Sequence, residues 1–169
     1  PFPTMVGTKF YNTQPPAEDA TTVSRLRSAG ALMVGKTNMH EIGIGVTGLN
    51  VPYGTTRNPH HLDHYPGGSS SGSAAAVAAG LSPIALGLDG GGSIRIPASL
   101  CGVVGLKTTW GRISSAGAAP LSWSVSTVGP ITSTADDAAL AYSFLAGADP
   151  RQLRTQNQPP VDLQDFNNA

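Results

Sequence analysis

The sequence predicts an α/β fold, in which helices and strands form layers around one core. Stretches with helical periodicity alternate with short apolar runs that end at glycine or at a polar residue, which is typical of such folds. Glycine (21 residues) and proline (14 residues) occur in clusters between these stretches, so they indicate the turns of an ordered domain. The length of 169 residues is enough for one domain with a sizeable core.

The charge composition argues against some partners. Charged residues make up 12% of the chain, with ten basic and ten acidic side chains. This balance gives no electrostatic reason to expect a nucleic acid or an anionic membrane surface as partner. No apolar run reaches the roughly 18 residues of a membrane span. The single cysteine, Cys101, excludes an internal disulfide framework and fits a reducing compartment such as the cytoplasm.

The first elements are expected before the glycine-rich centre of the chain. Residues 17–29 are predicted to form a helix, because acidic residues come first, apolar residues recur every three positions and Gly30 ends the pattern. Residues 31–34 are expected to form a buried strand, and a short helix should begin at Met39, capped by Thr37 or Asn38.

The later elements follow from periodicity and capping. The last helix begins at the capping-box spacing of Thr134 and Asp137. Before it, the chain should form a long irregular loop (43–65), a helix of small residues (71–79) and two short buried strands (84–88 and 103–107). The last helix itself is expected at 133–146.

Two clusters of glycine and serine, at 67–72 and 90–93, suggest nucleophilic chemistry. Glycine allows the backbone to approach a substrate closely and to aim N–H groups at it. Ser93 would attack, and Asp89 and Arg95 would fix its loop through charged hydrogen bonds. An oxyanion hole needs converging N–H groups, which this cluster offers from Gly90, Gly91, Gly92 and Ser93. The alternative is a glycine-rich turn whose serine only caps a helix.

The first cluster permits a different nucleophile. Residues 68–72 match the G-x-S-x-G elbow, in which Ser70 would attack as in an α/β-hydrolase. Such an elbow should follow a buried strand, and residues 64–66 are a poor strand end. The alternative for this cluster is a flexible turn that caps the small-residue helix.

Taken together, the clusters resemble the signature block of the amidase signature family, which includes fatty acid amide hydrolases, malonamidase and the amidase subunit of glutamyl-tRNA amidotransferase. The resemblance runs from about residue 2 to residue 150 and is carried by the motifs at 35–39, 67–73, 89–97, 101–102, 105–107 and 129–131. It implies a mixed β-sheet sandwiched between helices, incomplete at both ends of this chain. Residues 1–150 would belong to the amidase signature domain, and residues 151–169 would be a polar linker or the start of a missing C-terminal portion.

The resemblance also implies an activity, the hydrolysis of an amide bond without metal or organic cofactor. Ser93 would be the nucleophile of a Ser–cis-Ser–Lys triad, and Ser69 would be the cis-serine that relays protons. Ser70 would support these two, and Gly43 would offer backbone contacts to the substrate. The family's catalytic lysine lies in a Lys-Asp segment that this chain lacks, so we expect it upstream of Pro1 and expect the chain alone to be inactive.

Three alternatives concern partners and ligands. A chain without the lysine could be a non-catalytic binding or partner chain that keeps the fold. The G-x-G-x-x-G pattern at 43–48 lacks the flanking strand and helix of a dinucleotide site, and the loop histidines His60, His61 and His64 are more typical of solvent-exposed residues than of metal ligands. We therefore expect a small-molecule amide as substrate, and the rest of the polypeptide or a second copy as partner.

Overall fold

The computed structural model describes residues 2–11, 13–162 and 164–167. The strands are β1 (Ile84–Asp89), β2 (Val104–Gly105) and β3 (Thr127–Thr132). The α-helices are α1 (Thr21–Ser28), α2 (Ser71–Ala78), α3 (Arg95–Cys101), α4 (Ala135–Leu145) and α5 (Gln164–Asn167), and the 3₁₀ helices are η1 (Glu41–Gly43) and η2 (Leu153–Thr155).

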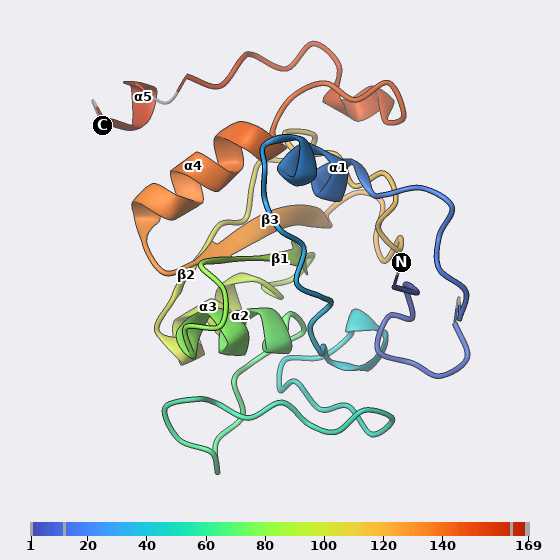
Figure 1. Ribbon diagram of the computed structural model, residues 1–169, viewed down its shortest axis with the longest axis vertical. Helices are drawn as coiled ribbons and strands as arrows, with labels where there is room; N and C mark the ends of the chain where they lie inside the picture. The colour runs from blue at the N-terminus through green and yellow to red at the C-terminus, as the bar shows by residue number, and fades with distance from the viewer. Residues whose placement is uncertain (1, 12, 163, 168–169) are drawn as a thin grey trace.

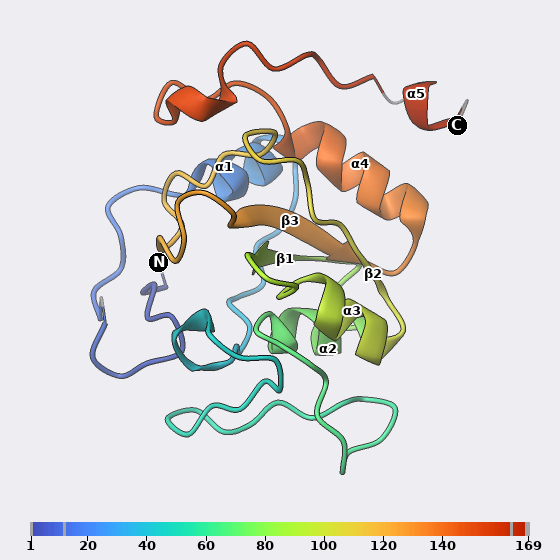
Figure 2. The ribbon, with the colours of Figure 1, turned by 180° about the vertical axis from the view of Figure 1, so that it is seen from behind.

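The three strands form one sheet that lies between two layers of helices. The strand order is β1-β3-β2, and both pairs are antiparallel. Helices α1 and α4 lie on one side of the sheet and α2 and α3 on the other (Figures 1 and 2). The predicted fold class is confirmed, with the detail that the strands described here pair only in antiparallel fashion.

Each face of the sheet buries its own apolar cluster. On the side of α1 and α4, Val128 packs with Leu26, Ile113, Ala141 and Leu145. On the side of α2 and α3, Ile131 packs with Ala74, Val77, Ile94 and Cys101. Val128 and Ile131 are an odd number of residues apart, so they point to opposite faces of the same strand. The central strand β3 therefore holds the two layers together.

The small residues of α2 are required by its surroundings. The helix contacts β1, β3 and α3, and its first turn lies against the backbone of Asn38. A Cβ on Gly72 would lie 2.4 Å from the carbonyl oxygen of Asn38, and the Gly72 N–H donates to that oxygen at 2.9 Å. The predicted helix at 71–79 is confirmed, and close packing on several sides explains why all its residues except Val77 are alanine, glycine or serine.

Strand β3 could not be recognised from sequence patterns because it contains Gly129 and Pro130, residues that normally end or interrupt strands. Here the glycine allows close approach, since a Cβ on Gly129 would lie 2.1 Å from the carbonyl oxygen of Leu106. Pro130 has no N–H to donate, but its carbonyl accepts from the Leu106 N–H at 3.0 Å. Both residues therefore suit this strand position.

The predicted strand at 31–34 is wrong. Residues 31–34 have no regular structure, and among the described residues no strand pairs with them. Leu32 is 88% exposed and Val34 is 83% exposed. A strand forms only where a neighbour completes its hydrogen-bond ladder, so the apolar pattern alone was insufficient.

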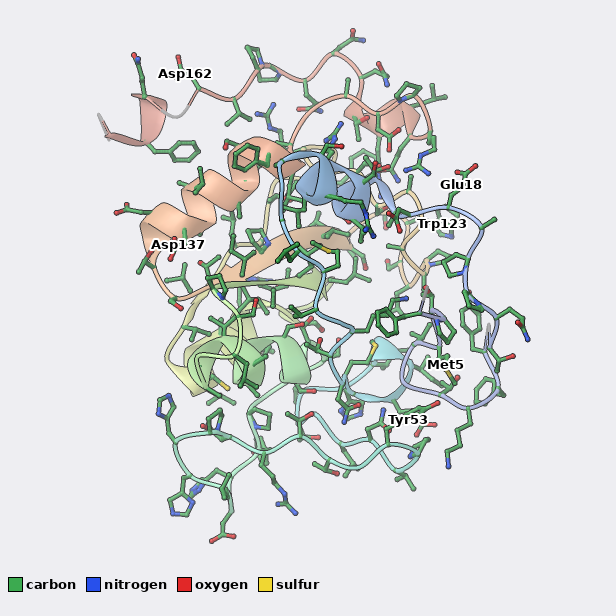
Figure 3. All side chains as sticks on the ribbon, in the orientation of Figure 1. Met5, Glu18, Tyr53, Trp123, Asp137 and Asp162 are labelled. Atoms are coloured by element: carbon green, nitrogen blue, oxygen red, sulfur yellow. The ribbon has the colours of Figure 1, made fainter. Side chains whose placement is uncertain are left out.

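The other predicted elements are shifted by a few residues. The first helix begins at Thr21, so Glu18 and Asp19 precede it instead of forming its first turn. The short helix expected from Met39 is η1, and the strand expected at 103–107 is reduced to β2. Helix α4 has the predicted cap, in which the Asp137 N–H donates to the Thr134 hydroxyl at 3.1 Å. Figure 3 shows Asp137 at the start of α4.

The residues after 150 contact the rest of the chain at several points. The Arg112 guanidinium donates to the carbonyl of Pro159 at 2.6 Å, and Arg154 donates to the carbonyl of Trp123 at 2.8 Å. A domain boundary at residue 150 stays a prediction. Within the part of the chain that the structure describes, no helix combines the length and apolarity needed to cross a membrane.

We predict that Ile131→Ala destabilises the protein far more than Leu140→Ala. Ile131 is fully buried in the central strand, whereas Leu140 on α4 is 42% exposed. Truncating a buried isoleucine should lower the free energy of unfolding by about 2–5 kcal/mol, and truncating the exposed leucine by less than about 1 kcal/mol. Urea unfolding measures both, and equal effects would contradict the position of the core.

Candidate active site

The loop after β1 is organised by one buried carboxylate. Asp89 is fully buried, and its two oxygens accept hydrogen bonds from the backbone N–H groups of Gly92 (2.8 Å), Ile94 (3.1 Å) and Arg95 (3.3 Å). The Arg95 side chain donates to the same carboxylate through Nε at 3.0 Å and through its terminal nitrogen at 3.1 Å. These bonds fix the conformation of residues 90–95.

The pKa of Asp89 reflects these bonds. Burial alone would raise the pKa of this carboxyl group, because it disfavours the charged form. The hydrogen bonds from the Arg95 side chain and from the three backbone N–H groups outweigh burial and lower the pKa to about 2. Asp89 is therefore an anion at neutral pH, and the scaffolding role of the Asp89–Arg95 pair stays a prediction.

The first serine cluster lies directly against the second. The Ser70 N–H donates to the carbonyl of Ser93 at 3.0 Å, which joins the two glycine-rich segments. Ser69 is buried and follows a cis peptide bond after Gly68. Its carbonyl accepts from the His40 N–H at 2.9 Å. The structure thus brings together two serine clusters that residues 73–89 separate in the sequence.

The Ser93 hydroxyl is available for chemistry. Ser93 is half-buried, just before α3. Within the described residues neither its hydroxyl nor that of Ser69 has a hydrogen-bond partner, and the N–H groups of Gly90, Gly91 and Ser93 are also without partners there. The Gly92 N–H differs, because it is bound to Asp89. Among the predicted oxyanion donors, three are therefore unoccupied.

Ser70 does not occupy a nucleophile elbow. Residues 64–69 form no strand, although an elbow requires one immediately before its serine. The Ser70 hydroxyl is buried and accepts from the Leu88 N–H at 3.3 Å. No histidine or acid is hydrogen-bonded to it in the described part of the chain. Ser70 therefore connects the loop to β1, and the α/β-hydrolase alternative has no structural support.

Two of the chain's lysines, Lys36 and Lys107, donate hydrogen bonds to backbone carbonyls. Lys107 Nζ donates to the carbonyls of Asp89 (2.5 Å) and Val125 (2.9 Å). Lys36 Nζ donates to the carbonyls of Phe2 (3.1 Å) and Pro3 (3.0 Å). Burial lowers the pKa of Lys36. Within the described residues, neither ammonium group is hydrogen-bonded to Ser69 or Ser93.

The remaining candidates are Gly43 and the loop histidines. Gly43 is buried with φ +73, and its N–H donates to the His40 carbonyl at 2.9 Å, so only its carbonyl is free for a ligand. His60 Nε2 is bound to the carbonyl of Cys101 at 2.9 Å. Among the described residues, no three His, Cys, Asp or Glu side chains are placed to share a metal ion.

The chain is similar in sequence to a family of known proteins. The sequence model of the amidase family matches residues 1–169. The fatty acid amide hydrolase of Oryza sativa subsp. indica is 49% identical over 162 residues, which are 95% of this chain and 27% of that protein. A glutamyl-tRNA(Gln) amidotransferase subunit of Desulforapulum autotrophicum is 48% identical over 166 residues, 98% of this chain and 33% of that protein.

A solved structure agrees with these relatives. The native peptide amidase of Stenotrophomonas maltophilia superposes with a TM-score of 0.91 and 42% identity, over 98% of this chain and 35% of that one. The fold is thus that of amide-hydrolysing enzymes of known structure. The chain belongs to the amidase family, and it spans between 27% and 33% of the length of the two curated relatives described above.

We predict that the stability contributed by Asp89 is lost in acid. Its folded-state pKa of about 2 lies below the ordinary value of 3.8, so its contribution is present above pH 3.8 and falls as the pH drops from 3.8 towards 2. Between pH 6 and pH 3, the free energy of unfolding of the wild type should fall by about 1 kcal/mol more than that of Asp89→Asn.

Denaturant unfolding at the two pH values provides the measurement. Asp136→Asn is the matched control, because Asp136 is exposed on α4, and this variant should keep the pH dependence of the wild type. If Asp89→Asn also kept it, the carboxylate would not have the predicted role.

Proposed function

We propose that the polypeptide that carries this chain hydrolyses a carboxamide through an acyl-enzyme on Ser93. The observation that supports this most is the contact between the two serine clusters, in which the Ser70 N–H holds the Ser93 carbonyl and the Ser93 hydroxyl is unoccupied. A loop that only capped a helix would not need a buried carboxylate, an arginine and a second serine turn around it. The amide-hydrolysing relatives support the same reaction.

In the proposed reaction, the Ser93 Oγ attacks the amide carbonyl carbon while its proton passes to Ser69. The N–H groups of Gly90, Gly91 and Ser93 donate to the oxyanion that develops. When the C–N bond breaks, the proton returns to the leaving nitrogen, which departs as ammonia or an amine. Water then attacks the ester carbonyl, releases the carboxylic acid and restores the Ser93 hydroxyl.

A serine hydroxyl is a weak nucleophile and needs a base. Because Lys36 and Lys107 are engaged with backbone carbonyls, we propose that a lysine outside residues 1–169 accepts the proton from Ser69. On this proposal the 169-residue chain alone is inactive, and the rest of the polypeptide completes the site. An additional partner chain is consistent with this proposal, since one relative is named as a subunit.

We predict that a fluorophosphonate probe labels Ser93 in the longest native form of the protein, as located by mass spectrometry. Ser93→Ala should abolish labelling and reduce kcat/KM for an amide by at least about 10³-fold. Ser69→Ala should reduce kcat/KM by about 10²-fold or more, because it removes the proton relay. Ser99→Ala is the matched control, because Ser99 is exposed on the neighbouring helix α3.

Two outcomes would contradict the proposal. Labelling that persists in Ser93→Ala would place the nucleophile elsewhere. A well-folded, full-length protein without any labelling would favour a non-catalytic binding or partner chain. Testing residues 1–169 beside the longer form shows whether the remaining polypeptide is needed.

A further inference from the structure

A pocket of about 250 Å³ opens near the end of β1, the strand that leads into the glycine-rich loop. Its walls come from the end of β1 at Leu88, from the loop at 115–126 and from η2 with its flanking residues. Trp123, labelled in Figure 3, is one of the lining residues. The volume is below the usual range for small-molecule sites, about 300–1,000 Å³, so the pocket suits only a short ligand.

The pocket reaches the proposed catalytic loop through Ser126. In the sheet, Asp89 pairs with Thr127, so Ser126 lies opposite the start of the glycine-rich loop. A Cβ on Gly90 would be only 3.0 Å from the Ser126 Oγ. Ser126 is 6% exposed, and its hydroxyl has no hydrogen-bond partner among the described residues. A buried hydroxyl without a partner is costly, and a polar ligand in the pocket would satisfy it.

Arg154 also lines the pocket, and its positive charge has no counter-ion among the described residues. Its guanidinium donates to the Trp123 carbonyl at 2.8 Å and to the Ser115 hydroxyl, and it lies 4.9 Å from the ring centre of Trp110. Two of its five donors are thereby used, and Nε is buried without a partner among the described residues. Within the same residues no carboxylate forms an ion pair with it.

Arg151 lines the same pocket but has acidic partners. It forms ion pairs with Glu18 at 3.3 Å and with the buried Asp149 at 3.8 Å. Of the two arginines that line this pocket, Arg154 is therefore the one without a counter-ion in the part of the chain that the structure describes, and Ser126 lines the same pocket. A guanidinium with free donors is well suited to bind a carboxylate.

We propose that this pocket binds a free carboxylate on the substrate, so that the amide is a short one that carries a second acid group. The inference rests on the proposed function, because it places the amide at Ser93 and the carboxylate at Arg154. Arg154 would be the residue that determines specificity, and Ser126 would hydrogen-bond the polar part of the substrate between the two ends. A long neutral acyl chain would leave the charge of Arg154 buried and unpaired.

The test compares two isosteric amides with the full-length protein. Succinamate carries an amide and a carboxylate, whereas succinamide replaces the carboxylate by a second, neutral amide. The wild type should prefer succinamate by about 10- to 100-fold in kcat/KM, the range expected for a charge-assisted hydrogen bond. Arg154→Met should abolish this preference, and Arg154→Lys should restore part of it. Arg27→Met, at an exposed arginine paired with Asp19, should leave the preference unchanged.

A second measurement separates this inference from the proposed function. Succinate should bind the wild type in isothermal titration calorimetry and should bind Arg154→Met at least about ten times more weakly. Equal effects of Arg154→Met on both amides, or equal succinate binding, would overturn the carboxylate site even if Ser93 is labelled. Loss of labelling at Ser93 with intact succinate binding would instead overturn the hydrolase proposal and leave a carboxylate-binding protein.

Discussion

The buried carboxylate of Asp89 is the constraint on which the candidate site depends. It lies at the end of β1, and the backbone of residues 92–95 closes around it through N–H donors. A buried charge is tolerated only when such donors surround it, so the sheet cannot bury Asp89 without also shaping the loop that follows. The conformation of Ser93 is thus determined by the electrostatics of a residue four positions before it. Arg95, on the solvent side, completes the same arrangement.

Local patterns predicted the elements whose stability is mainly local. The helix at 71–79 and the capped helix after Thr134 follow from composition and side-chain capping, and the structure contains both. Patterns failed where long-range pairing decides the outcome. Gly129 fits β3 because it allows the close approach of the Leu106 carbonyl, and Pro130 fits because its own carbonyl accepts from the Leu106 N–H. Residues 31–34 lack a partner strand among the described residues. A single sequence does not reveal which neighbour is present.

The candidate site was likewise predictable only where local sequence patterns identify its residues. The two glycine–serine clusters, and Asp89 with Arg95, could be recognised because their residue types are unusual and close in sequence. Ser126 and Arg154 could not be predicted as ligand-binding residues, because nothing in their local sequence distinguishes them. Their significance comes from a shared pocket and from missing partners, which are properties of the folded chain.

Lys107 limits which parts of the chain can change without disturbing the glycine-rich loop. Its single ammonium group binds the carbonyl of Asp89, at the base of the glycine-rich loop, and the carbonyl of Val125, near the end of the loop that lines the pocket. The two loops therefore share one anchoring point. Insertions or exchanges at 115–124 can remodel the lining of the pocket while the Val125 carbonyl stays in place, and the glycine-rich loop is then unaffected. A change that moves the Val125 carbonyl would shift Lys107 and therefore disturb both loops. Sequence changes that alter only the pocket are thus confined to the residues before Val125.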